Sequence, residues 1–148
     1  MVIEMLIAIS IMATSILAAM TVSQRSINVS RQAFHATQAA FLLEEGAEII
    51  RLFRDNGWSN ISSLTAGFNY SPDFSAGAWV LSETVSPTGI FTRIVTVANV
   101  NRDNTTKDIA SIGADDPGTK LVTITVSWPE GSLTITKNLS FYLMDIFS

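Results

Sequence analysis

The chain lacks cysteine and has a single histidine among its 148 residues. Without cysteine it has neither a disulfide framework nor a thiol site, which leaves its compartment open because many exported proteins also lack cysteine. Its 9 basic residues are outnumbered by 13 acidic ones, so it offers no basic surface for nucleic-acid phosphates. The sequence contains no phosphate-binding loop, no metal-spaced His or Cys cluster and no nucleophile with a base nearby. We therefore expect no catalytic residue, no cofactor and no enzyme activity.

Proline and glycine are missing from residues 1–45, and this stretch begins with a long apolar run. From Met5 to Val22 only two serines and two threonines are polar, and the only charge before Arg25 is Glu4. About 18 residues give roughly 27 Å of helix, against a bilayer hydrocarbon core of about 30 Å. We expect residues 1–22 to be a helical segment that lies in a membrane or among copies of itself. No basic residue precedes the run and no convincing cleavage site follows it, so we expect the mature protein to keep it.

The helical pattern continues over residues 23–55 as an amphipathic helix. Its apolar residues recur mostly at spacings of four and seven: Ile27, Phe34, Phe41, Leu42, Ile49 and Phe53. Asn56-Gly57 suits a helix C-cap, so we expect the helix to end near Asp55. Gly46 inside a helix costs about 1 kcal/mol relative to Ala, which indicates either close packing on another element or a tolerated cost.

Residues 56–148 have the pattern of an antiparallel β head, and residues 23–148 are expected to form one globular unit. The range 58–77 reads as a loop with a short strand or helical turn. Two short strands, 78–83 and 91–97, form one expected pair, and residues 121–128 and 133–141 form a hairpin of alternating apolar and hydroxyl side chains. Between the pairs, residues 100–119 read as a long polar loop.

The first residues resemble those of a known family. The run Val2-Ile3-Glu4-Met5-Leu6-Ile7-Ala8-Ile9 is similar to the start of type IV pilins and pseudopilins, in which a glutamate is followed by a long uncharged helix. Later stretches, such as DPGTKLVTITVSW, resemble bacterial prepilin-like proteins of the minor-pilin type. The resemblance implies an α+β ladle fold, in which a long N-terminal helix packs on an antiparallel sheet of about four strands.

The same resemblance implies a pathway of processing and assembly, and a set of partners. A prepilin peptidase removes a short basic leader and methylates the new terminus, and an assembly platform moves subunits from the inner membrane into a helical filament at the cell surface. The chain's principal partner is then itself. The glutamate is fourth here and fifth in the mature family pattern, so either one leading residue is missing or Met1 is the mature end.

Glu4 is the residue with the clearest expected role. An unpaired carboxylate or amine in an apolar filament core or bilayer costs several kcal/mol, so we expect Glu4 to pair with the N-terminus of a neighbouring subunit and thereby set the register. A simpler alternative is a favourable acid at a helix N-terminus. The residues expected to mediate assembly are Met1, Glu4, Met5, Leu6, Ile9, Ile16 and Leu17.

Three alternatives accompany the prediction of a pilus subunit. The chain is a minor pilin, a secretion-system pseudopilin, or a monomeric binding module that the helix anchors in a membrane. In addition, the polar loop offers oxygen ligands for Ca²⁺, with a solvated loop as the plainer alternative. The candidate calcium ligands are Asn101, Asp103, Asp108, Asp115 and Asp116.

Overall fold

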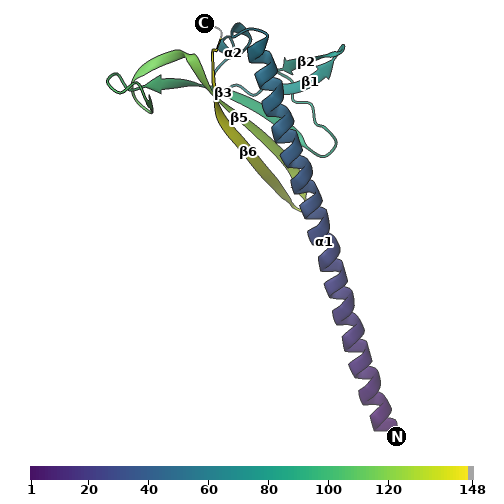
Figure 1. Cartoon of the computed structure of the whole chain (residues 1–148). Coiled ribbons are helices and arrows are strands. Elements are labelled where there is room, and N and C mark those ends of the chain that lie inside the picture. The colour runs from purple at the N-terminus through teal and green to yellow at the C-terminus, as the bar shows by residue number, and fades with distance from the viewer. Residues whose placement is uncertain (147–148) are drawn as a thin grey trace. The chain divides into compact units, whose positions relative to one another are not determined.

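The computed structural model describes residues 1–146, and its first element is the single helix α1, Val2–Asp55 (Figure 1). The predicted helix and its end are confirmed. No Gly or Pro interrupts the helix before Gly46, so nothing before that point removes a bond of the i to i−4 ladder or weakens it. The chain forms two compact units, Met1–Gln38 and a second unit that begins at Ala39. The boundaries predicted for residues 1–22, 23–55 and 56–148 follow composition and stay predictions.

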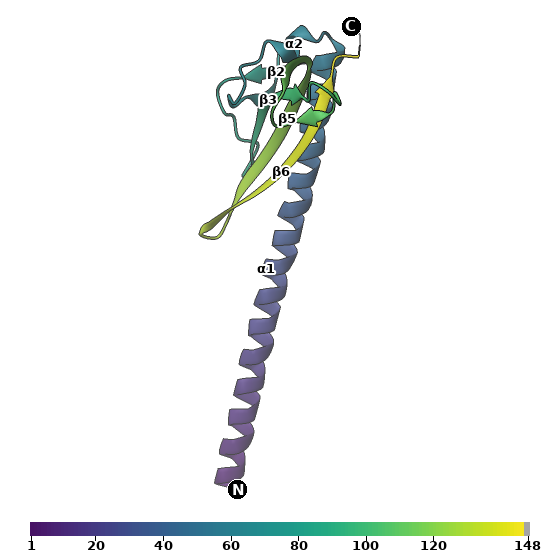
Figure 2. The same cartoon turned by 90° about the vertical axis from the view of Figure 1, so that its left-hand side faces the viewer.

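The second unit is built on an antiparallel sheet. Its strands are β3 (Thr92–Arg102), β4 (Ile109–Ala110), β5 (Ala114–Glu130) and β6 (Leu133–Met144), in the order β4-β3-β5-β6. Figure 2 shows β5 and β6 as one long hairpin of this sheet. The C-terminal part of α1, from Ala39, packs on one face of the sheet. The predicted α+β arrangement, a long N-terminal helix on a four-stranded antiparallel sheet, is confirmed.

Alternation along the central strands places one face of the sheet in the core. In β5, Val122, Ile124, Val126 and Trp128 are buried, and the residues between them are half-buried on the other face. In register, Val95 of β3 lies opposite Ile124. These side chains meet an apolar face of α1 that consists of Ala39, Leu43, Ala47 and Ile50. Each large side chain buried here contributes about 1.5–3 kcal/mol.

Gly46 lies where α1 comes closest to the sheet. A Cβ atom at this position would lie 3.1 Å from Cγ2 and 3.3 Å from Cδ1 of Ile124, and 3.5 Å from Cδ of Arg93. The first two distances are tighter than ordinary van der Waals contact. The glycine therefore marks close helix–sheet packing, which is one of the two explanations that the sequence allowed for Gly46; the other was a tolerated cost.

The predicted pairing of residues 78–83 with 91–97 is wrong. Strand β2, Ala78–Ser82, pairs instead with β1, Ser71–Ser75, in a separate two-stranded sheet. The two residues between these strands, Ala76 and Gly77, both have positive φ angles, 52° and 83°, which is the geometry of a tight two-residue hairpin turn. A short helix, α2 (Ser59–Ser62), precedes this hairpin, so the predicted helical turn is present in residues 58–77.

The predicted polar loop of residues 100–119 is mostly strand. Strand β3 continues to Arg102 and β5 begins at Ala114, so the ladder extends beyond the apolar segments of both strands. The register shifts between Asn99 and Asn101, where a bulge lets polar residues join the ladder. Backbone pairing does not require apolar side chains, which is why the alternation pattern missed this extension.

Candidate assembly surface

The first unit begins with residues 1–22, a helical surface that is apolar apart from Glu4 and four hydroxyl residues. All side chains of residues 1–34 are exposed. The predicted assembly residues Met1, Glu4, Met5, Leu6, Ile9, Ile16 and Leu17 all belong to this surface. By length and composition, α1 is able to cross a membrane. Exposing so many apolar side chains to water is unfavourable, so a surface of this kind is stable only when lipid or protein covers it.

The four hydroxyl groups of residues 1–22 are satisfied within the helix. Ser10 donates to the carbonyl of Ile7 at 2.8 Å, and Ser15 donates to that of Ile11 at 2.7 Å. Thr14 and Thr21 donate to carbonyls three or four residues back in the same way. Because these donors need no outside partner, the segment can enter lipid or a packed apolar core without leaving them unpaired.

Glu4 is the exception on this surface. Its Oε2 lies 3.4 Å from the amine of Met1 within the same chain, and both groups are exposed. An exposed pair of this kind contributes little in water. In apolar surroundings the carboxylate needs a cationic partner far more, because desolvation of a charge costs several kcal/mol. Pairing with a neighbouring chain stays a prediction.

The second unit contains a buried charge that the sequence patterns did not identify. The Arg93 side chain is 5% exposed, forms an ion pair with Glu45 of α1, and donates to the Leu42 carbonyl at 3.3 Å. Its guanidinium carbon lies 5.7 Å from the ring centroid of Trp79 in β2. Arg93 thus ties α1, β3 and the β1-β2 hairpin together. The alternation of Phe91, Arg93 and Val95 indicates that Arg93 points inward, but it does not indicate Glu45 as the partner.

Two of the calcium candidates have protein partners. Asp116 accepts hydrogen bonds from Arg102 Nε at 2.6 Å and from the Gly118 amide at 3.0 Å. Hydrogen bonds from Thr119 and Arg102 hold the pKa of Asp116 below its usual value. Asp103 accepts from the amides of Thr105 and Thr106. The Thr106 amide, followed by that of Thr105, lowers the pKa of the Asp103 carboxyl.

The five candidates do not converge on one point. Asp103, Asp115 and Asp116 line a shallow hollow together with the cations Arg102 and Lys107. Asn101 lines a different hollow, beside β4. Within residues 1–146, no group of three or more His, Cys, Asp or Glu side chains is placed to hold a metal ion. The calcium site stays a prediction that no ligand cluster supports.

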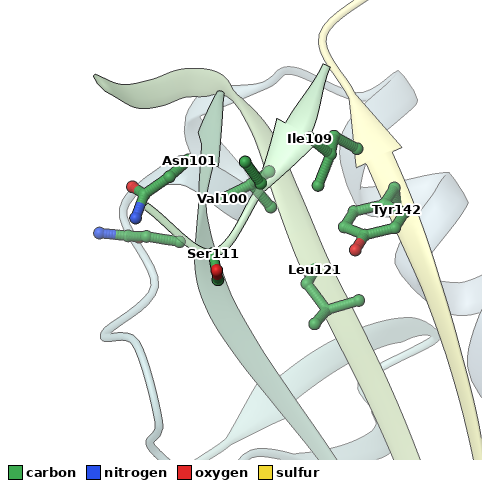
Figure 3. A pocket seen from close by; sticks show the side chains of 8 residues that line it. Val100, Asn101, Ile109, Ser111, Leu121 and Tyr142 are labelled. Carbon is green, nitrogen blue, oxygen red and sulfur yellow. The ribbon is translucent and has the colours of Figure 1, made fainter. Parts of the chain in front are cut away.

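A larger hollow of about 380 Å³ lies beside β4 (Figure 3). Ile109, Leu121 and Tyr142 form an apolar side, and Asn99, Asn101 and Ser111 supply amide and hydroxyl groups. None of its lining residues is charged, so the hollow pairs no nucleophile with a base.

Comparison of the chain with protein-family models, with curated proteins and with solved structures finds no match. The family resemblance of the first residues accordingly stays an expectation.

Proposed function

We propose that this chain is a structural subunit of a type IV pilus-type filament that is stored in a membrane and assembles through the apolar half of α1. The exposed, uncharged surface of residues 5–22 is the observation that carries the proposal. Its hydroxyls bond back to the helix, and its single flanking acid is Glu4. A prepilin peptidase and an assembly platform are the partners that this function requires.

The energetics suit reversible transfer between lipid and filament. Burying a large aliphatic side chain contributes about 1.5–3 kcal/mol relative to water, so the segment does not remain in water. Lipid covers the same side chains nearly as well as protein does, so moving a subunit from membrane to filament is close to balanced. What distinguishes the two environments is Glu4, because outside an assembly its only nearby cation within residues 1–146 is the chain's own amine at 3.4 Å, whereas an assembly adds a neighbour's amino terminus.

The test is a substitution that removes this charge and keeps the shape. Glu4→Gln in the full chain, expressed in the cells that make it, is expected to leave the amount of protein in the membrane fraction unchanged and to abolish surface filaments in electron micrographs. Glu48→Gln removes an exposed acid of the same helix that pairs locally with Arg51, so filaments should persist in this control. Normal filaments from the Glu4→Gln variant would contradict the proposed role of Glu4.

Deleting the protein separates the remaining alternatives. Loss of all filaments supports a major subunit, and fewer filaments support a minor pilin or a pseudopilin that primes assembly. Filaments unchanged in number would leave the membrane-anchored binding module, and would reject both filament roles.

A further inference from the structure

The sheet face opposite α1 carries hydroxyl groups and no charge. It consists of every second residue in 92–98 of β3, 121–127 of β5 and 136–142 of β6, and we name it the hydroxyl face. Seven of its twelve residues are Ser or Thr, one is Asn and none is charged. The charged residues within these ranges, Arg93 and Lys137, occupy positions of the other face. Neutrality is therefore a property of this face and not of the strands as a whole.

The strand register sets the polar groups in rows across the three strands. Thr96, Thr123 and Ser140 form one row, and in the next row Thr125 lies opposite Asn138. The hydroxyl oxygens of Thr123 and Ser140 lie 2.8 Å apart and share a hydrogen bond. Because a hydroxyl has one donor and two acceptor positions, both groups keep hydrogen-bonding capacity. The residues of β6 are exposed and those of β5 are half-buried, so a partner that lies flat on the face can reach these groups.

The hollow beside β4 continues the hydroxyl face at one end. Leu121 and Tyr142 lie opposite each other in β5 and β6, belong to this face, and also line the hollow. Figure 3 shows them near Ile109, with Asn101 and Ser111 on the other side of the hollow. The volume of about 380 Å³ falls within the range of about 300–1,000 Å³ that is typical of ligand sites. Tyr142 and Ile109 are 50% and 40% exposed, so a ligand can contact both.

We propose that the hollow and the hydroxyl face bind a neutral polysaccharide. A sugar ring has an apolar C–H face that packs on aromatic and aliphatic side chains, and hydroxyl groups at its rim that bond to amides and hydroxyls. The hollow offers the first kind of contact at Ile109, Leu121 and Tyr142, and the second kind at Asn101 and Ser111. Further sugar units along the same chain meet the rows of Thr, Ser and Asn on the hydroxyl face.

The chemistry of this face disfavours other classes of partner. Nucleic acids and anionic polymers require cationic side chains, and an anionic lipid surface attracts basic residues, which the hydroxyl face lacks. A protein interface has an apolar core, whereas Thr and Ser occupy the centre of this face. A neutral polyhydroxyl chain leaves no charge unpaired and matches the hydroxyl groups. Such binding goes beyond the proposed function, because a filament subunit and a membrane-anchored module would both present the same face.

Retention on insoluble polysaccharides tests the proposal. The full chain, purified in a detergent without a sugar headgroup, is mixed with cellulose, chitin or mannan, and with calcium alginate beads as an anionic comparison. Tyr142→Leu removes the aromatic ring of the hollow, and Asn138→Glu places a charge on the exposed part of the hydroxyl face. The matched controls are Phe74→Leu, which removes a 60% exposed ring of β1, and Asn104→Glu at an exposed turn position.

The expected result is retention on at least one of the three neutral polysaccharides and none on alginate. Tyr142→Leu should weaken binding about tenfold, the factor that a loss of about 1.4 kcal/mol produces. Asn138→Glu should weaken it several-fold, and both controls should bind as the parent chain does. No retention on any neutral polysaccharide, equal retention on alginate, or an equal loss in the Phe74→Leu variant would overturn the proposal. It would also be overturned if sedimentation showed that Asn138→Glu splits an oligomer, because the face would then contact a second copy.

Discussion

Replacing Gly46 by alanine measures how tightly α1 packs on the sheet. The new methyl group has two opposing effects. It favours the helix by about 1 kcal/mol, the difference in propensity between Ala and Gly. It also places a carbon 3.1 Å from Cγ2 and 3.3 Å from Cδ1 of Ile124, and overpacking of this kind costs about 1–3 kcal/mol. The net expectation is a loss of about 0–2 kcal/mol in the free energy of unfolding.

Truncating Ile124 should reverse the sign of the stability change that Gly46→Ala causes. Ile124→Ala deletes both contacting carbons and costs about 2–5 kcal/mol by itself. In that background the methyl group of Gly46→Ala has room, so only the propensity gain remains and the substitution should stabilise the protein by about 1 kcal/mol. The coupling between the two sites then equals the overpacking energy, about 1–3 kcal/mol.

The assay is urea unfolding of the full chain in detergent, followed by the fluorescence of tryptophans such as the buried Trp128. Ala40→Gly, on an exposed position of the same helix, is the control, and should destabilise by about 1 kcal/mol. If Gly46→Ala stabilises the parent protein as much as it stabilises the Ile124→Ala variant, the two effects are additive. Additivity would refute the claim of close packing.

Two further predictions concern charged residues of the second unit. Glu45→Leu leaves the buried Arg93 cation without its partner, whereas Arg93→Met leaves a carboxylate that is 47% exposed and can be solvated. We therefore expect Glu45→Leu to lower the free energy of unfolding more than Arg93→Met does, by about 1–3 kcal/mol. Equal losses would show that the buried charge is not the costly partner. Asp116 has a folded-state pKa below its unfolded value, so its stabilisation is present above the unfolded value and is lost as the pH falls through the folded one. Asp116→Asn should therefore lower stability at pH 7 by a few tenths to about 1 kcal/mol and make the acid side of the stability curve shallower. An unchanged pH profile would show that the hydrogen bonds from Thr119 and Arg102 to Asp116 do not contribute.

The sequence predicted those parts of the fold in which one side-chain period dominates. The apolar run and the absence of Gly and Pro before Gly46 identify the long helix, because its backbone ladder has no interruption. The alternation from Val122 to Trp128 identifies the buried face of β5. In both cases local pattern and tertiary packing agree, so periodicity suffices.

The parts that were missed depend on contacts between distant residues. The β1-β2 hairpin contains Pro72, which is uncommon within strands, and it turns at Ala76-Gly77 rather than at the common Asn-Gly. The Arg93 ion pair joins β3 to Glu45, which lies 48 residues earlier in the chain, and no local spacing indicates it. The apolar character of residues 1–22 follows directly from composition, whereas what covers this segment is not encoded in any local pattern.

We propose that residues 1–22 assemble with copies of themselves and that Glu4 pairs with a neighbour. Cryo-electron microscopy of filaments sheared from cells that express the full chain tests it most directly. We expect a filament core formed by the apolar half of α1 from many copies, with each Glu4 carboxylate within ion-pair distance of an adjacent subunit's amino terminus. Filaments that lack this chain, or a core in which Glu4 has no cationic partner, would contradict it.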